Sequence, residues 1–556
     1  MSDSEADIPD CSIYEVIANS KKKYGSGIAV NYYGRKMTYS CLLKSIDKCA
    51  AALHSLNVGR GDHISVILPN IPQAVILFYA SNRIGAICDM IHPLSSVHEL
   101  ENYIRQSEAR IVFAFEALAP NIGFISQFVE KVFIVSASES LPALSKLGYK
   151  IRTKTKNSMP EGFETYRDFI AHADKAAVKQ VKDIEFSKPD EPCAVLYTGG
   201  TTGKPKGVLL SSRNFNASAD EAIDSCGCLK AGDKMLEILP VFHGFGLGVG
   251  VHTVLMFGGT TILMPTFKMK SIDALINRYK PEILAGVPAI FGAMIAGVSK
   301  NCDMSFVKLV ISGGDRLPND IMRSFNELLV SHGSRTTIRQ GYGLTECLSG
   351  VCLVPEHCAK DNCIGSVYKD TRFRIVGIDS NEELVNGESG EILICGPAVM
   401  LGYLNEPEES DNALERDNDG NVWLHTGDCG HIGDDGLVYF DSRIKRMIIS
   451  NGYNIYPGVL EDVISAHESV LECCVTGIPD RMRGEIVKAF IVFDYSVIKR
   501  GEEDEALKSI KNDLKLSVSK YQLPRSYMIL EELPRTAIGK IDAEALIRTK
   551  HPETCR

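Results

Sequence analysis

Short apolar runs alternate with amphipathic stretches along most of this 556-residue chain. Runs such as 64–68, 194–197, 307–311 and 337–339 predict strands, and the stretch from Pro318 to Gly333 predicts a helix with apolar residues at helical spacing. Strands that alternate with helices in this way are typical of α/β architecture. A chain of this length also exceeds one domain, so we expect a large N-terminal α/β domain followed by another.

The pattern changes twice toward the C-terminus. From about 377 to 440 the chain is turn-rich with short strands, which predicts a small β-structured subdomain. After Arg443 a new pattern begins, with helices expected at 460–464 and 502–517 and strands at 473–475 and 487–492. We therefore predict an N-terminal domain of residues 1–442 and a smaller α+β C-terminal domain of residues 443–556.

Composition excludes some classes of function. Lys+Arg 60 against Asp+Glu 70 gives a net charge of -10, which lacks the basic surplus of a nucleic-acid binder. The start of the chain, Met1 to Asp7, is acidic and polar, unlike a secretory signal. The 17 cysteines are scattered through expected strands and helices, which favours a reducing compartment. We expect a cytoplasmic protein. The densest cysteine group, 347–363, has no C-x-x-C pair and does not indicate a metal site.

One segment tests the expectation of a soluble protein. Residues 238–267 contain no Asp, Glu, Lys or Arg and are numerous enough to span a bilayer. Glycines and prolines interrupt the segment, and it stands alone. It therefore predicts a buried helix flanked by a functional loop rather than an integral membrane segment.

The strongest local signal for chemistry directly follows a predicted strand. It reads Tyr197-Thr198-Gly199-Gly200-Thr201-Thr202-Gly203-Lys204-Pro205-Lys206-Gly207. Glycines let backbone N–H groups approach a polyphosphate, and the threonine hydroxyls and lysines supply further donors. It is not the P-loop of kinases and ATPases, because the glycine spacing is one residue too short and Pro205 replaces the magnesium-binding hydroxyl.

This run resembles the phosphate loop of the adenylate-forming superfamily, which includes acyl-CoA synthetases, luciferases and carrier-protein-loading adenylation domains. Further motifs follow in the expected order and extend the resemblance over nearly the whole chain. They are Gln340-Gly341-Tyr342-Gly343-Leu344-Thr345-Glu346, Thr426-Gly427-Asp428, the hinge residues Arg443 and Lys445, and the segment 534–540 ending in Lys540. The resemblance implies ATP, magnesium and coenzyme A as cofactors and a mobile C-terminal domain that pivots at Lys445.

The resemblance also implies a role for each motif. Tyr342 offers a flat face to adenine, with the turn Gly313-Gly314-Asp315 making room for the base. Asp428 can accept both hydroxyls of the ribose diol, and Arg443 reaches the nucleotide. Glu346 supplies a hard oxygen ligand for magnesium. Lys540 lies close to both the substrate carboxylate and the α-phosphate, where it offsets the repulsion of two anions. Thr345 and His243 complete the expected catalytic set.

The acid and its acceptor are less sharply indicated. The motif Leu239-Pro240-Val241-Phe242-His243-Gly244-Phe245-Gly246 resembles the one that borders the acyl pocket, and amino-acid-activating members generally carry Asp where His243 stands. An apolar acid, in first place a fatty acid, is therefore expected, with Val287, Phe291, Leu344, Cys347 and Leu348 either extending the pocket wall or packing in the core. Ser450-Asn451-Gly452-Tyr453 resembles the stretch that admits the pantetheine arm.

Three readings of the function stay open. The first is an AMP-forming acyl-CoA synthetase. The second is an aryl-acid CoA ligase or a freestanding adenylation enzyme that loads a carrier protein, and the third is a catalytically silent sensor of acyl-adenylate or acyl-CoA. A homodimer or a carrier protein is an open partner. Ser442, Arg446 and Val459 depart from the family's pattern and leave the details of hinge geometry and thioester formation unsettled.

Overall fold

The structure is a computed structural model that describes residues 8–142, 145–146, 149, 159–198, 205–265, 272–358, 360–378, 380, 382–450, 453–480, 484–518, 522–535 and 541–550. The side chains at 445, 449, 453, 454, 549 and 550 are outside this description. The chain forms two compact units: residues 1–373 with 394–425, and residues 374–393 with 426–556.

The first unit contains a mixed sheet built around a parallel centre. In order it runs β2 (Arg35–Thr38), β1 (Ile28–Tyr32), β11 (Thr260–Leu263), β10 (Lys234–Glu237), β12 (Ile283–Gly286), β13 (Leu309–Ser312), β14 (Ile338–Gly343), β15 (Gly350–Leu353) and β16 (Cys363–Val367). The strands from β1 to β14 pair in parallel, while β2, β15 and β16 pair antiparallel. The carboxyl ends of the parallel strands therefore meet at one edge, where ligands of open α/β sheets bind.

A second sheet of eight strands completes this unit. Its order is β19 (Gly402–Tyr403), β9 (Lys206–Ser211), β8 (Pro192–Thr198), β4 (Ile87–Met90), β3 (His63–Ile67), β5 (Ile111–Phe115), β6 (Lys131–Val135) and β7 (Glu164–Thr165). Strands β3, β4 and β5 are almost entirely buried, as expected for parallel strands covered on both faces. The short β19 brings a distant segment beside β9: Tyr403 pairs with Val208.

Helices begin where the sequence provides caps. Ser12, Ser96 and Ser211 each form a capping box with the residue three positions on, and Pro288 occupies the first turn of its helix. The helices of this unit are α1 (Ile13–Tyr24), α2 (Tyr39–Ser55), α3 (Pro72–Arg83), α4 (Val97–Ser107), α6 (Tyr166–Ala171), α7 (Lys175–Lys182), α8 (Ser212–Cys226), α9 (Val254–Met256), α10 (Ile272–Tyr279), α11 (Pro288–Gly297), α12 (Asn319–Ser331) and α13 (Pro407–Ala413), with short 3-10 turns at Glu116–Asn121, Gly123–Gln127, Ala137–Ser140 and Thr345–Cys347.

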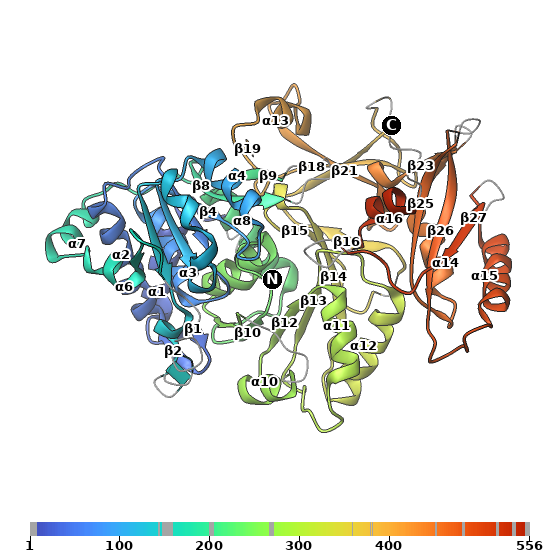
Figure 1. The fold of residues 1–556 in the computed structure, drawn as a ribbon, viewed down its shortest axis with the longest axis horizontal. Helices are drawn as coiled ribbons and strands as arrows, with labels where there is room; N and C mark the ends of the chain where they lie inside the picture. The colour runs from blue at the N-terminus through green and yellow to red at the C-terminus, as the bar shows by residue number, and fades with distance from the viewer. Residues whose placement is uncertain are drawn as a thin grey trace, which may run out of the picture. The chain divides into compact units, whose positions relative to one another are not determined.

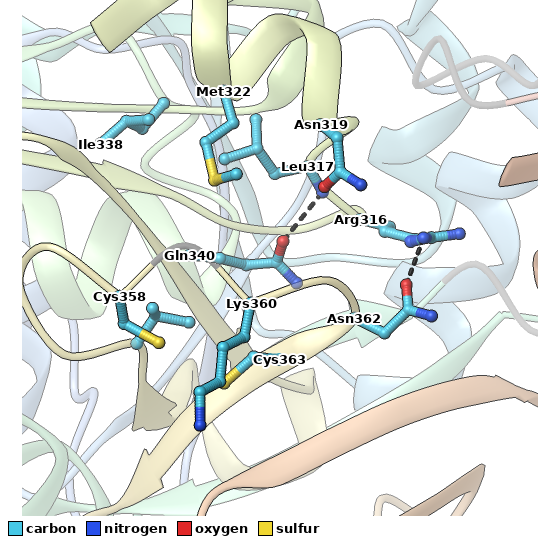
Figure 2. A pocket seen from close by; sticks show the side chains of 11 residues that line it. Arg316, Leu317, Asn319, Met322, Ile338, Gln340, Cys358, Lys360, Asn362 and Cys363 are labelled. Atoms are coloured by element: carbon cyan, nitrogen blue, oxygen red, sulfur yellow. Dashed lines mark hydrogen bonds between the residues drawn. The ribbon is translucent and has the colours of Figure 1, made fainter. Parts of the chain in front are cut away.

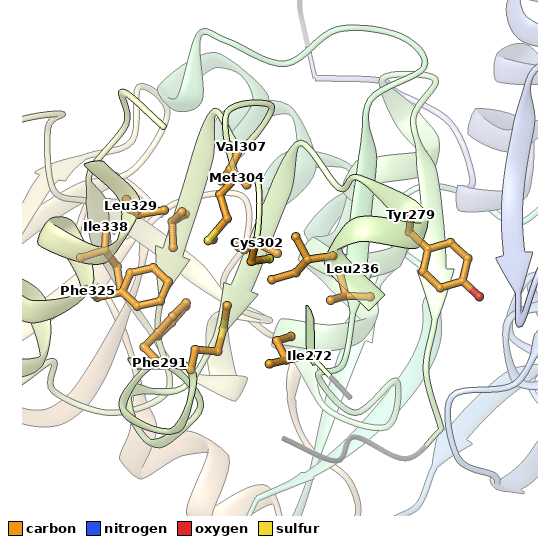
Figure 3. Packing of buried hydrophobic residues seen from close by; sticks show 14 of the residues in the cluster. Leu236, Ile272, Tyr279, Phe291, Cys302, Met304, Val307, Phe325, Leu329 and Ile338 are labelled. Atoms are coloured by element: carbon orange, nitrogen blue, oxygen red, sulfur yellow. The ribbon is translucent and has the colours of Figure 1, made fainter. Parts of the chain in front are cut away.

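Three helices cover one face of the first sheet. Figure 1 shows α10, α11 and α12 along the strands from β10 to β14, and their apolar residues pack on alternate residues of those strands. The cluster includes Phe291 against Phe325, with ring centroids 4.9 Å apart (Figure 3). Phe291 is thus a core residue of this face, and of the two readings of its side chain the packing one is right.

The opposite face of the sheet meets the segment that the sequence singles out as uncharged. Residues Phe245–Thr253 form a π-helix, η4, that continues into α9. The Thr253 hydroxyl donates to the Gly248 carbonyl at 3.0 Å, in keeping with the wide turn. His252 is buried and bonded through both ring nitrogens, to Tyr79 and Asn216. The expected buried helix is present, but as a π-helix. Among the described helices, none combines the length and apolarity needed to cross a membrane.

The second unit contains two smaller sheets. One pairs β17 (Arg372–Val376), β18 (Gly390–Cys395), β21 (Val422–Ile432) and β22 (Val438–Arg443) in that order. The first residues of β21, Val422 to Leu424, pair with β20 (Leu414–Arg416) within the first unit. The other has the order β24 (Tyr453–Ile455), β23 (Ile448–Ser450), β26 (Gly484–Phe493) and β25 (Val470–Asp480), with β27 (Ser526–Ile529) parallel to β26. Helices α14 (Pro457–Ser465), α15 (Glu503–Ser517) and α16 (Ala543–Lys550) belong to this unit. The helices expected near 460 and 502–517 are confirmed.

Candidate functional site

The predicted phosphate run lies between two paired strands. Thr198 ends β8 and faces Lys206, the first residue of β9, across an antiparallel pair. Residues Gly199, Gly200, Thr201, Thr202, Gly203 and Lys204 fall outside the described residues. The two described ends are therefore held beside each other by the hairpin, as a short loop between antiparallel strands requires.

Lys206 contacts two residues from a distant part of the chain. Its ammonium forms an ion pair with Glu409 of α13 and lies 4.6 Å from the ring centroid of Tyr403. The Tyr403 hydroxyl in turn donates to Glu346 Oε1 at 2.8 Å. The motif lysine and the motif glutamate are thus joined through one tyrosine that the sequence reasoning did not name. Burial and the adjacent Glu346 carboxylate raise the pKa of Tyr403, so this phenol stays protonated as a donor.

Glu346 sits in a tight turn. It is half-buried in the 3-10 turn Thr345–Cys347, and its backbone carbonyl accepts from the Met400 amide at 2.8 Å. One carboxylate oxygen is bonded to Tyr403, and a carboxylate has room for further ligands on its remaining lone pairs. No three His, Cys, Asp or Glu side chains gather in a metal-binding arrangement within the described ranges. A single anchored carboxylate suits a cation whose other ligands are phosphate oxygens and water.

The turn after Glu346 is pressed against the turn that follows His243. Leu348 has φ +63°, a left-handed conformation that a leucine rarely adopts. A Cβ added to Gly244 would lie 1.6 Å from the Leu348 carbonyl oxygen, and one at Gly248 would lie 3.2 Å from Leu348 Cγ. His243 itself is exposed, and its Nδ1 accepts from the Phe245 amide at 3.2 Å. Only glycine fits at 244 in this arrangement.

The expected adenine motif is the end of β14. Gln340 pairs with Ser312 of β13, and the next three residues, Gly341 to Gly343, pair antiparallel with β15. Tyr342 is half-buried, with its ring centroid 6.2 Å from that of Phe373. On the neighbouring strand end, Gly314 is exposed with φ +78°, a conformation that favours glycine. The described motif residues thus meet at the carboxyl ends of adjacent strands.

A small pocket opens beside Gln340 (Figure 2). The Gln340 side chain accepts from the Leu317 amide at 3.0 Å, which ties β14 to the chain just after Asp315. Arg316 donates to the Asn362 carboxamide on the other side of the pocket. Lys360 also lines it. Gln340 therefore helps to hold the turn at 313–315 in place, whatever else it contacts.

Two further motif residues lie together in the second unit. Asp428 and Arg443 face each other across β21 and β22, and Arg443 Nε lies 3.1 Å from Asp428 Oδ1. The Asp428 side chain is 1% exposed, whereas that of Arg443 is 45% exposed. Thr426 and Glu391 fix the turn before Asp428: the Thr426 hydroxyl accepts from the Asp428 amide at 3.0 Å, and Glu391 accepts from the Gly427 amide at 2.9 Å.

The remaining predicted residues are described in part or not at all. Lys445 lies in the 3-10 turn Ile444–Arg446, but its side chain is outside the described atoms. Gly452 and Lys540 are outside the described residues. Arg535 and Ile541, which flank the segment with Lys540, form an antiparallel bridge. Arg446, one of the departures from the family pattern, is paired with Glu461 of α14 and donates to the Val475 carbonyl at 3.3 Å. This departure is thus accommodated by an acidic partner.

Apolar side chains line the face of the sheet under the π-helix. Met235 and Leu239 flank Glu237 on the strand side, and the half-buried Phe245, Val249, Val287 and Ile311 pack against the same cluster. A Cβ at Gly313 would lie 3.1 Å from the Phe245 ring. Solvent reaches this apolar face at the half-buried members, next to the predicted adenine turn. The arrangement suits an apolar group bound beside a nucleotide.

Comparison with protein families places these motifs in a known context. The sequence profile of the AMP-binding enzyme family matches residues 17–404, and that of the AMP-binding enzyme C-terminal domain matches residues 459–540. Among characterised proteins, the chain is 32% identical over 544 residues to a long-chain-fatty-acid–CoA ligase of Bacillus subtilis, covering 97% of this chain and 94% of that protein. It is 29% identical to 4-coumarate–CoA ligase 2 of rice (Oryza sativa subsp. japonica), covering 91% and 86%.

Solved structures share the fold. ATP-bound MatB from Rhodopseudomonas palustris superposes with a TM-score of 0.81 at 24% identity, covering 96% of this chain and 98% of that one. A benzoate CoA ligase from Burkholderia xenovorans LB400 gives a TM-score of 0.78 at 21% identity, covering 96% and 99%. At these identities the likeness concerns the fold alone. It agrees with the expected architecture of a large N-terminal α/β part and a smaller C-terminal part.

Proposed function

The chain belongs to the AMP-binding enzyme family, and from that membership we propose that it is an AMP-forming acid–CoA ligase acting on an apolar acid, in first place a fatty acid. In the first step a carboxylate oxygen attacks the α-phosphorus of ATP, the bond to the β-phosphate oxygen breaks, and acyl-adenylate and pyrophosphate form. In the second step the CoA thiol gives up its proton, its sulfur attacks the acyl carbon, and AMP leaves with the oxygen it shared with that carbon.

The contact chain from Lys206 through Tyr403 to Glu346 carries this proposal. It joins a cation of the phosphate loop to a carboxylate through a 4.6 Å ring contact and a 2.8 Å hydrogen bond. An acid with a pKa near 4 to 5 is already ionised at neutral pH, so the first step needs no general base. It needs cations and donors that hold two anions together. In our proposal the threonines and lysines of 198–206 contact the phosphates, and Lys540 contacts both reacting groups.

Magnesium enters this proposal as the partner of the ATP phosphates. Glu346 would hold the ion, since its carboxylate is anchored by Tyr403 on one oxygen and keeps lone pairs for a cation. The bound ion neutralises part of the phosphate charge. Thr345, in the same 3-10 turn, is proposed to contact the nucleotide phosphate from its position beside Glu346.

The nucleotide's adenine and ribose are assigned to two groups of residues. The Gly314–Asp315 turn and Gln340 to Gly343 are proposed to border the base. Asp428 is proposed to accept from both ribose hydroxyls, with Arg443 beside it. Lys445 and the segment around Gly452 remain our candidates for the hinge and the pantetheine path. We keep residues 443–556 as the proposed mobile domain.

Asp428→Asn should raise the KM for ATP by about 10- to 100-fold, because a charged acceptor of two hydrogen bonds becomes a weaker one. The Arg443 side chain is already 45% exposed, so its charge stays hydrated when it loses the carboxylate partner. The free energy of unfolding should therefore hardly change. Steady-state kinetics with varied ATP measure the effect. Asp441→Asn on the neighbouring strand, where the carboxylate accepts from Ser389 at 2.6 Å, is the control. An unchanged KM in Asp428→Asn would contradict the ribose role.

The choice of an apolar acid rests on the apolar face under the π-helix and on the residue at 243. Phe245, Val249 and Val287 present hydrocarbon there, and a histidine stands at the position that would need a carboxylate to pair with an amino acid's ammonium group. The relatives that resemble this chain are named as ligases of both a fatty acid and an aryl acid. We favour the fatty acid because its named ligase is the more similar of the two.

ATP–pyrophosphate exchange across straight-chain, branched, aryl and amino acids tests the proposal, followed by AMP release with and without CoA. We expect exchange with straight-chain apolar acids and CoA-dependent AMP release. Exchange without CoA use would point to a carrier protein as acceptor, and strongest exchange with aryl acids would favour the second reading of the substrate. No exchange with any acid would overturn the proposal. The cytoplasm is the proposed compartment, and the oligomeric state is to be measured alongside.

A further inference from the structure

Glu237 is a buried carboxyl group that the proposed chemistry does not use. It ends β10, is 0% exposed, and neither of its carboxyl oxygens has a hydrogen-bond partner among the described residues. Its backbone is satisfied, since its carbonyl accepts from the Met264 amide at 3.0 Å. Nearly all buried polar groups in native proteins are paired, so an unpaired buried acid requires a reason.

A glycine of the π-helix leaves the space that the Glu237 carboxyl group fills. A Cβ on Gly250 of the π-helix would lie 1.4 Å from Glu237 Oε2 and 2.3 Å from its Cδ, so the carboxyl group occupies the space that glycine leaves. His252, a buried polar side chain of this π-helix, has both ring nitrogens bonded. The local structure can therefore pair buried polar groups, yet within the described part of the chain it gives neither carboxyl oxygen of Glu237 a hydrogen-bond partner.

The acid belongs to the same apolar wall as the proposed acyl site. Side chains alternate along a strand, so Glu237 shares a face of β10 with Met235, and Leu239, just after the strand, belongs to the same cluster as Met235. Both are in the cluster that includes Phe245, Val249, Val287 and Ile311, whose half-buried members solvent reaches. The carboxyl group is thus a hydrogen-bonding group in an apolar wall.

Burial determines the form of this acid. Desolvation raises the pKa of Glu237 well above its usual range, with the Leu239 backbone acting in the opposite direction. An ionised carboxylate without a partner is far more costly to bury than a neutral acid. The neutral acid offers one O–H donor and a carbonyl acceptor. A hydroxyl group, which both donates and accepts, is complementary to it.

We propose that Glu237 binds a hydroxyl group carried on the acyl chain of the substrate, so that the enzyme prefers a hydroxylated chain over its unsubstituted counterpart. This inference rests on the proposed ligase function and names the substrate class more closely. A wall that was only a hydrocarbon surface would gain from an apolar residue at this position. In this proposal the acid is a specificity-determining residue that contacts the acyl chain and takes no part in the chemistry at the carboxylate.

The test compares decanoic acid with positional hydroxydecanoic acids, using pyrophosphate release with wild type, Glu237→Leu, Glu237→Gln and Met264→Leu. Met264 is a buried residue of the core cluster that contains Phe291 and Phe325, outside the proposed acyl wall, and serves as the control. We expect wild type and Met264→Leu to prefer one hydroxylated isomer by about 10-fold or more in kcat/KM, as loss of a buried hydrogen bond implies. Glu237→Leu should lose this preference while keeping activity on decanoic acid, and Glu237→Gln should keep part of it.

Stability gives a second measurement that does not depend on activity. Glu237→Leu removes an unpaired polar group from an apolar site, so its Tm should rise by about 2–4 °C over wild type. A preference equal in wild type and Glu237→Leu, or no hydroxyl preference in wild type that still activates decanoic acid, would overturn the inference and leave the ligase function standing. Absence of pyrophosphate release with every acid would instead overturn the ligase function and this inference with it.

Discussion

Lys540→Ala is expected to slow acyl-adenylate formation by about 10²- to 10³-fold, the usual cost of removing a group that stabilises developing charge. Two anions, the carboxylate and the α-phosphate, must meet in that step, and a cation that contacts both lowers their repulsion only there. Thioester formation from supplied acyl-adenylate has no such encounter. The rate of thioester formation should therefore stay within about 2-fold of wild type, a far smaller change than the one expected for acyl-adenylate formation.

The two half-reactions can be measured separately. Pyrophosphate exchange reports the first, and AMP release from synthetic acyl-adenylate with CoA reports the second. Lys508→Ala, an exposed lysine on α15 in the same unit, controls for the loss of one positive charge. Equal loss of both half-reactions in Lys540→Ala would show that the lysine supports the fold or CoA binding and would refute the assignment.

Glu346→Gln is expected to lower adenylation by about 10²-fold and to raise the magnesium concentration needed for half-maximal rate, because a neutral amide oxygen is a much weaker ligand than a carboxylate. The substitution preserves shape, and an oxygen can still accept from Tyr403 at the position that now lies 2.8 Å from the phenol. The rate measured over a series of magnesium concentrations tests the assignment.

Tyr403→Phe separates positioning from metal binding. It removes the hydrogen bond to Glu346 and keeps the aromatic ring that lies 4.6 Å from the Lys206 ammonium. One such bond contributes about 1 kcal/mol, so we expect a loss of about 5- to 10-fold with a small change in magnesium dependence. If Glu346→Gln changed the rate without changing the magnesium dependence, Glu346 would be a structural residue of the turn and no metal ligand.

Most of the described strands and helices follow from local pattern. The predicted strands at 64–68, 194–197 and 307–311 correspond to β3, β8 and β13, and the helix from Pro318 corresponds to α12. These elements carry their own signals, which are apolar periodicity and a proline at the start. The strand expected at 337–339 is longer, because β14 continues through the motif to Gly343 by pairing with β15.

Features that depend on distant contacts were not predictable in the same way. Tyr403 reaches Glu346 because β19 pairs with β9 across almost 200 positions of sequence, and nothing local to Gly402–Tyr403 signals that pairing. The π-helix at Phe245–Thr253 likewise gives no periodic signal, because apolar residues and glycines make up nearly all of its sequence and leave no polar face. Phe291 could be assigned to the core only once the two faces of its sheet were known.

Under the proposed function, the close approach of Gly244 to Leu348 connects the turn beside the acid with the turn beside magnesium-bound ATP. With the Leu348 carbonyl oxygen only 1.6 Å from where a Cβ would stand at Gly244, neither turn can advance on the other. If an acid that binds beside His243 moves that turn toward Leu348, the turn that carries Glu346 has to move as well. Linkage is reciprocal, so whatever the acid does to the affinity for magnesium-bound ATP, that nucleotide does equally to the affinity for the acid. Under the proposed function, the enzyme would sense both ligands at one steric contact.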